Sequence, residues 1–108
     1  MSYRPDNWIL VKIAGTHPHY RVFAVWRGGY INGDSWRMNS GVVGVDEDDD
    51  YYYFKGHSGS VYECHKLAYG RIGGYGSSVL YGYVENSAGT LEVIQEMPDV
   101  MNIEWSPK

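Results

Sequence analysis

The sequence predicts an all-β fold, a small antiparallel barrel or sandwich of about six to seven short strands in a meander-like order. Three observations lead to this prediction. Apolar and polar side chains alternate at every second position in several short stretches. Turn-forming residues separate these stretches at intervals of about 8 to 15 residues. No stretch of ten residues has a clean helical period, and the 14 glycines fall too often for long helices.

The predicted strands each begin after a turn signal and carry the two-residue period. In order along the chain, they cover residues 7–14, 19–27, 35–46, 51–55, 61–66, 78–85 and 90–96. In the first strand, Ile9 and Val11 share one face while Trp8 and Leu10 share the other. Both faces are apolar, so the pattern leaves open which of them is buried.

The connections between these strands have distinct signals. Gly28 and Gly29, followed by Asn32 and Gly33, predict a hairpin turn. The third strand is expected to be broken or bulged near residues 39–41, because an interior glycine often marks a bulge. Residues 67–77 are predicted to form a loop. In the tail, residues 97–108, the stretch 100–105 is expected to be an edge strand or a single helical turn.

Composition predicts one folded domain spanning residues 1–108. The chain is 44% hydrophobic and 20% charged, which is too apolar for a disordered protein. Its net charge of −4 argues against a nucleic-acid coat. Five of the 13 acidic residues form the run 46–50, however, so the rest of the chain is close to neutral. This acidic run is expected to be a solvated hairpin tip, and the remaining surface is compatible with anionic ligands.

The compartment predicted from the sequence is the cytoplasm. The single cysteine, Cys64, has no partner for an internal disulfide, and the start of the chain lacks a signal-peptide pattern. The longest apolar run, Trp8 to Val11, is far shorter than the roughly 18 residues of a membrane span. We therefore expect no membrane association.

Metal and catalytic motifs are incomplete, so we expect no metal, no cofactor and no catalytic residue. The acidic run has the first ligand spacing of a calcium loop, but Tyr51 replaces the required glycine and His57 the required glutamate. The other histidines and Cys64 lack zinc-site spacing. No nucleophile elbow or phosphate-binding loop motif is present. A small hydrolase that uses His57 or Cys64 remains an alternative, although a buried, inert Cys64 is favoured.

The segment 69–78 predicts a pocket for a nucleotide-like or other small anion. Its glycines let backbone N–H groups converge on an anion, and Arg71 can hold a phosphate or carboxylate in a fork. The candidate ligand-binding residues are Arg71, Tyr69, Tyr75, Gly73, Gly74, Ser77 and Ser78. The alternative is an ordinary mobile connector between two strands.

A second set of residues predicts a partner-binding surface. The aromatic content of 16% is too large for the core alone, and exposed Tyr and Arg commonly anchor interfaces. The candidates are Tyr51, Tyr53, Tyr81, Tyr83, Arg21, Arg27 and Arg37. Should the second and third strands pair, the three arginines would form a positive strip for single-stranded nucleic acid or a cyclic nucleotide. Core tyrosines and solvated arginines are the alternative, and nucleic acid is the less favoured partner.

Four short stretches carry a resemblance to known sequences, namely residues 33–41 (GDSWRMNSG), 56–66 (GHSGSVYECHK), 69–70 (YG) and 77–80 (SSVL). In these stretches the chain resembles small hypothetical accessory proteins of tailed phages. It implies an accessory or counter-defence role in the host cytoplasm, exercised by stoichiometric binding. The leading hypothesis is therefore a non-catalytic protein that blocks a host protein or sequesters a nucleotide-type ligand. A structural or virion-associated homo-oligomer is the alternative.

Overall fold

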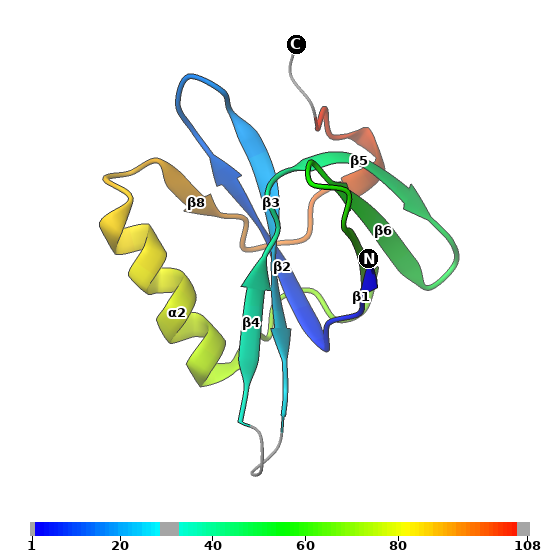
Figure 1. The fold of residues 1–108 in the computed structure, drawn as a ribbon, viewed down its shortest axis with the longest axis horizontal. Helices are drawn as coiled ribbons and strands as arrows, with labels where there is room; N and C mark the ends of the chain where they lie inside the picture. Colours follow the sequence, from blue (N-terminus) through cyan, green and yellow to red (C-terminus); the bar gives the residue numbers. More distant parts are fainter. Residues whose placement is uncertain (1, 29–32, 106–108) are drawn as a thin grey trace.

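Two four-stranded sheets pack against one another, and a helix covers the opposite face of one of them (Figure 1). This arrangement is that of a computed structural model, which describes residues 2–28 and 33–105. The sheets do not close into a barrel, so the fold is a sandwich and the predicted all-β class is confirmed. Gly29 and Asn32 of the predicted hairpin turn lie outside the described residues.

The sheet between the helix and the other sheet is called the central sheet. Its strand order is β4 (Ser35–Met38), β3 (His19–Trp26), β2 (Asn7–Ile13) and β8 (Leu91–Val93). The outer sheet has the order β1 (Ser2–Tyr3), β7 (Val61–His65), β6 (Tyr51–Gly56) and β5 (Val42–Glu47). The remaining elements are the helix α2 (Gly73–Asn86) and the helical turn η1 (Val100–Asn102).

The predicted meander is found within each sheet, but the first and last strands of the chain do not follow it. Strands β2 to β4 and strands β5 to β7 pair in sequence order, and all these pairs are antiparallel. The predicted break near residues 39–41 is confirmed, and it carries the chain from the central sheet to the outer sheet. Two pairings do not follow the meander: β1 runs parallel to β7, and β8 returns to pair with β2.

The apolar faces of β2 and β3 lie in two separate cores. Trp8 and Leu10 face the outer sheet, where they join Phe54 and Cys64 in one buried cluster. Ile9 and Val11 face the helix and pack with Leu80. A strand that is covered on both sides needs apolar residues at every position, which explains why the sequence pattern did not distinguish an outside face.

The expected loop 67–77 is found only over residues 67–72, and the expected strand 78–85 is wrong, because residues 73–86 form the helix α2. The buried residues of the helix are Gly76 and Leu80, and the residue before the helix, Ile72, is also buried. These three residues are spaced four apart, so they lie on the same face. A Cβ at Gly76 would lie 3.1 Å from Val25 Cγ2, so the glycine lets the helix approach the sheet closely. Packing thus overrides the low helix propensity of a glycine-rich segment.

The tail forms a single helical turn, one of the two expected forms, and it contributes to the core. Val100 of η1 and Trp105 are buried in the cluster between the two sheets. The Trp105 ring makes edge contacts with Tyr20 and Phe54. The acidic residues 46–50 are exposed at the connection between β5 and β6, as predicted.

Candidate functional site

The segment before α2 is held in an unusual backbone conformation. Arg71 has a φ of 52°, between Gly70 at 73° and Gly73 at 77°. A residue with a side chain rarely adopts this left-handed conformation, so surrounding contacts must hold it. Arg27 supplies one of them by donating a hydrogen bond from Nη2 to the Arg71 carbonyl at 2.7 Å. Burial of Ile72 supplies another.

The N-terminus of α2 is positively charged and has no compensating acid. No side chain caps the helix at Ile72, and its first turn contains no acidic residue. The N–H groups of the first turn carry the positive end of the helix dipole. The Arg27 guanidinium is also close, because its Nη1 lies 3.2 Å from where a Cβ on Gly73 would be. Acidic groups are usually found at a helix start, but here the nearby charge is positive. A bound anion would balance this positive charge.

A cavity of about 370 Å³ opens beside this helix start. Its lining includes four of the predicted ligand-binding residues, namely Arg71, Gly73, Gly74 and Ser77. Ile9, Tyr81 and Gln95 line the remaining wall together with neighbouring backbone. The structure therefore brings part of the predicted set together around a hollow.

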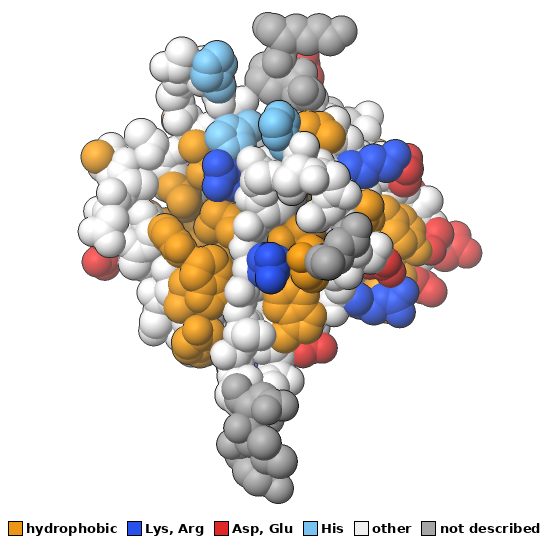
Figure 2. Space-filling view, viewed as in Figure 1, with side chains coloured by type: hydrophobic (Ala, Val, Ile, Leu, Met, Phe, Trp, Pro, Cys, Tyr) orange, Lys and Arg blue, Asp and Glu red, His pale blue; other side chains and the backbone are white. Residues whose placement is uncertain are grey.

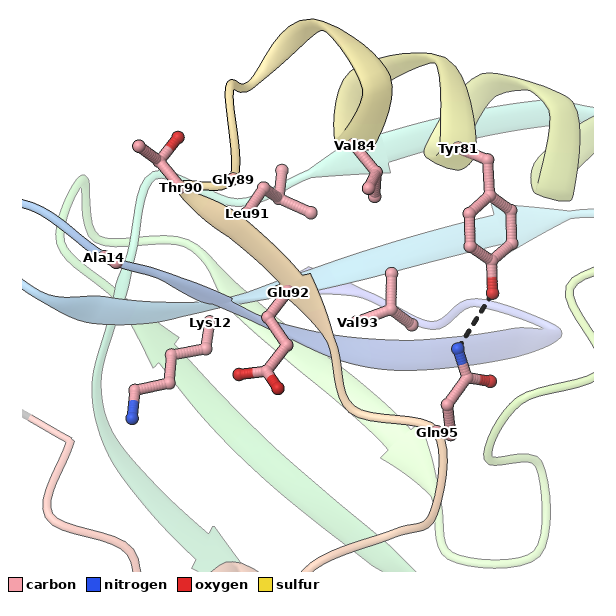
Figure 3. Close-up of a pocket in the computed structure, with 10 residues that line it drawn as sticks. All are labelled: Lys12, Ala14, Tyr81, Val84, Gly89, Thr90, Leu91, Glu92, Val93 and Gln95. Carbon is pink, nitrogen blue, oxygen red and sulfur yellow. Dashed lines mark hydrogen bonds between the residues drawn. The ribbon is translucent and has the colours of Figure 1, made fainter.

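A second cavity, of about 530 Å³, continues along β8. Figure 3 shows Tyr81 pointing from α2 toward β8, where its hydroxyl accepts a hydrogen bond from Gln95 Nε2 at 2.9 Å. Tyr81 and Gln95 line both cavities, so the two hollows meet at this pair. Together they form what we call the α2/β8 groove, which has the Arg71 cavity at one end. Lys12 and Glu92 point away from the helix in Figure 3.

Three predicted ligand-binding residues lie outside the groove lining. Tyr69 is partly buried against Trp8, at 4.8 Å between ring centroids, and donates a hydrogen bond to the Ile94 carbonyl at 2.6 Å. Burial raises the pKa of Tyr69 to about 12. It is thus a core residue and offers no stacking surface to a ligand in the groove. Tyr75 and Ser78 are exposed on α2 and do not line the Arg71 cavity.

The four predicted partner-binding tyrosines do not form two matching strand faces. Tyr51 and Tyr53 lie on β6, as expected, but both are only partly exposed. Tyr81 and Tyr83 lie on the helix rather than on a strand and point to different neighbours. Tyr83 packs against Trp36 of β4 at 5.5 Å, whereas Tyr81 bonds to Gln95. The prediction that Tyr81 and Tyr83 share one face of a strand is wrong. In a helix, residues two positions apart are rotated by about 200° around the axis.

The predicted positive strip is also wrong, although β3 and β4 pair as required. Arg37 is registered with Ala24, whose side chain faces the outer sheet. Arg21 alternates with Phe23, which faces the helix side, and Arg27 reaches the same side through its hydrogen bond to the Arg71 carbonyl. The three arginines therefore lie on opposite faces of the central sheet. The Arg37 guanidinium instead lies 4.6 Å from the centre of the Tyr3 ring.

Cys64 is buried between the sheets, and this burial raises the pKa of its thiol well above the usual value. A thiol that resists ionisation in the core is poorly suited to nucleophilic attack. Among the described residues, no group of three or more His, Cys, Asp or Glu side chains is placed to hold a metal ion. The described part of the chain also contains no helix of the length and apolar character needed to cross a membrane.

Sequence reasoning missed Gln95, Ile9 and the role of Arg27 in this site. Gln95 follows a three-residue edge strand whose pairing with β2 has no local sequence signal. Arg27 was recognised as basic, but its contact with the Arg71 carbonyl depends on tertiary structure. Comparison of the chain with protein-family models, curated proteins and solved structures found no match.

Proposed function

We propose that the protein is a non-catalytic binding protein and that its α2/β8 groove takes a nucleotide-type anionic ligand. The observation that carries this proposal is the cavity of about 370 Å³ that opens beside Arg71 at the uncapped start of α2. A small-molecule site commonly combines such a hollow with a few convergent polar groups. No acidic residue lines this cavity.

The phosphate end of the ligand belongs at the helix start. The N–H groups of Gly73 and Gly74 are in the first turn, where no intrahelical acceptor is available to them. Arg71 adds a charged, fork-shaped donor, and Ser77 adds a hydroxyl. Helix starts of this kind bind phosphate because amide donors and the helix dipole act together.

The organic part of the ligand would extend along the groove past Tyr81. The larger cavity has apolar lining from Val84, Leu91 and Val93, and the Tyr81 ring forms a wall shared by both cavities. Such a surface accepts a flat ring by stacking or by apolar contact. The combination favours a nucleotide-type ligand over inorganic phosphate alone.

An accessory or counter-defence role in a phage-infected cell, in the cytoplasm, is part of the proposal. It is supported only by the sequence resemblance in residues 33–80. Sequestration of a host nucleotide would need no catalytic group, which is consistent with the inaccessible thiol of Cys64.

Isothermal titration calorimetry with AMP, ADP, ATP and cyclic nucleotides tests the proposal. We expect saturable binding of at least one of them, and a loss of affinity of about tenfold or more in Arg71→Gln, because a charged hydrogen bond is removed. Arg37→Gln is the matched control, since Arg37 lies on the opposite face of the central sheet. The proposal fails if no nucleotide binds, or if Arg71→Gln binds as tightly as the wild type.

A second candidate function, docking of a partner protein or a second copy, is favoured by the tyrosines of α2. Tyr75, Tyr81 and Tyr83 are 45%, 42% and 44% exposed. Sedimentation velocity of the wild type and of Tyr75→Ser checks the homo-oligomer: a dimer that dissociates in the variant supports it. A strict monomer at high micromolar concentration excludes self-association through this face.

A further inference from the structure

A third hollow lies where the chain crosses from the central sheet to the outer sheet. Strand β4 pairs with β3 only from Phe23 to Trp26, so the first half of β3 has no β4 partner. Beside this stretch is a cavity of about 290 Å³. We call it the histidine pocket, after His17, His19 and His57 in its lining. It shares no lining residue with the α2/β8 groove.

The lining of the histidine pocket is basic and lacks acidic residues. Its charged and titratable side chains are the three histidines and Arg21. No Asp or Glu lines it, although the chain has 13 acidic residues and a net charge of −4. Figure 2 shows histidine side chains gathered beside a Lys or Arg side chain toward one end of the molecule. Arg21 is therefore a positive charge with no acidic residue beside it in the lining, which favours an anion over a cation.

Arg21 is oriented by its neighbours. Its Nε donates a hydrogen bond to His19 Nε2 at 3.0 Å. Because His19 Nε2 accepts, the other ring nitrogen carries the proton and donates to the His17 carbonyl at 2.8 Å. Within the described residues, no acceptor engages the two terminal nitrogens of Arg21. A guanidinium held at Nε presents these two nitrogens to a ligand with little loss of conformational freedom.

Trp105 provides a second feature that indicates a ligand. Its side chain is only 7% exposed, and its indole nitrogen is buried without an acceptor among the described residues. Buried N–H groups are almost always paired, so an unpaired one in a pocket wall calls for an acceptor. Other atoms of the Trp105 side chain line the pocket. Val42 and Val43 make the wall beside the indole apolar.

We infer that the histidine pocket is a second ligand site, which binds a small oxyanion carried by a single ring. The phosphoryl or carboxylate group is placed against Arg21, and the ring packs against Val43 and Trp105. The volume of about 290 Å³ is just below the usual range for small-molecule sites and suits a compound with a single ring. This inference does not depend on the α2/β8 groove, because the two sites use different residues.

Nuclear magnetic resonance titration with phenyl phosphate, benzoate and inorganic phosphate tests the inference. We expect saturable shifts of the ring signals of His17, His19 and His57 and of the Trp105 indole N–H. His65 is the internal control, because its ring accepts a hydrogen bond from the Leu67 N–H and lies outside the pocket. A response to phenyl phosphate but not benzoate identifies a phosphoryl ligand, and the reverse identifies a carboxylate. Absence of saturable shifts with all three probes overturns the inference.

Variants separate this site from the groove. Arg21→Gln is expected to weaken binding of the responding probe at least tenfold, whereas Arg71→Gln leaves it unchanged. Val43, which is 45% exposed at the rim, gives a second pair of variants that spares the core. Both Val43→Asp and Val43→Asn lose the apolar contact with the ring, and Val43→Asp should bind more weakly than Val43→Asn because only the aspartate adds charge repulsion. Equal affinity in Arg21→Gln and the wild type, or in the two Val43 variants, contradicts the assigned location.

Discussion

Asp48 and Tyr53 show how single residues order the acidic end of the outer sheet. The Asp48 carboxylate accepts hydrogen bonds from the Tyr53 hydroxyl and from the N–H groups of Asp50 and Tyr51. These bonds stabilise the ionised form and lower the pKa of Asp48, with the Tyr53 hydroxyl making the largest contribution. The same bond raises the pKa of Tyr53 to about 12. A tyrosine predicted to face a partner is therefore engaged within its own hairpin.

The Tyr53→Phe variant should raise the pKa of the Asp48 carboxyl. Because this pKa is lower in the folded chain than in the unfolded chain, ionised Asp48 stabilises the fold at neutral pH. That contribution is lost as the pH falls through the folded-state pKa, and less of it should be present in the variant. Carboxyl NMR titration, together with urea unfolding at pH 7 and at pH 3, measures both effects. Tyr51→Phe is the control, because the hydroxyl bonded to Asp48 is that of Tyr53.

An unchanged Asp48 titration in Tyr53→Phe would contradict this assignment. So would an equal shift in the Tyr51→Phe control.

Helix α2 is the element on which the groove depends, and its glycines have different roles. Gly76 faces the central sheet, with Val25 and Ile72 close to its Cα hydrogens. Gly82 has open space around it and an ordinary backbone conformation. Glycine is disfavoured in a helix by about 1 kcal/mol relative to alanine, so each position trades propensity against packing.

Gly76→Ala and Gly82→Ala should therefore change stability in opposite directions. At Gly76 the new Cβ would lie 3.1 Å from Val25 Cγ2 and 3.2 Å from Ile72 Cβ, so the crowding should exceed the propensity gain. We expect a net destabilisation of about 1–2 kcal/mol, in the range of overpacked cores. At Gly82 we expect stabilisation of about 0.5–1 kcal/mol. Urea unfolding of both variants measures the difference, and stabilisation by Gly76→Ala would show that the helix does not approach the sheet this closely.

For the whole molecule, the central sheet joins two cores into one structure. Strands β2 and β3 contribute alternate residues to the cluster beneath the outer sheet and to the cluster beneath α2. If either cluster unfolds, one face of β2 and β3 becomes exposed to water. The two cores should therefore unfold together.

Leu80→Ala tests this coupling from the helix side. Leu80 is fully buried, so the truncation should cost about 2–5 kcal/mol. In a Trp36→Phe background the remaining tryptophans, Trp8, Trp26 and Trp105, lie in or against the other core, so their fluorescence reports on that core. Unfolding measured by this fluorescence should coincide with unfolding measured by far-ultraviolet circular dichroism on the same variant. Two separate transitions would show that the helix layer unfolds independently.

Residue alternation predicted the sheets well, because a strand's faces depend on local sequence alone. The opposite faces of Trp8 and Ile9, and the break near residues 39–41, follow from this rule. Helix α2 was missed because its glycines indicated a loop and Val79, Tyr81 and Tyr83 imitated a strand. Its formation depends on contact with Val25, which lies far away in the sequence.

The candidate site was predicted only in its local part. Arg71 and the adjacent glycines could be recognised together because a single segment contains them. Gln95 is brought to the site by the pairing of β8 with β2, and Arg27 by its hydrogen bond to the Arg71 carbonyl. Neither residue can be predicted from a short sequence motif. The histidine pocket has the same origin, since His19 and His57 are brought together only by the crossing between sheets.

The central claim is that an anion binds at the start of α2, and a backbone amide NMR titration with ATP tests it most directly. We predict that the largest saturable shifts occur at the amides of Gly73, Gly74 and Tyr75, whose N–H groups lie in the uncapped first turn. These shifts should need about tenfold more ATP or a larger excess to saturate in Arg71→Gln, and they should be unchanged in Arg37→Gln. Saturable binding that leaves the three amides unmoved, or no binding at millimolar ATP, would contradict the account.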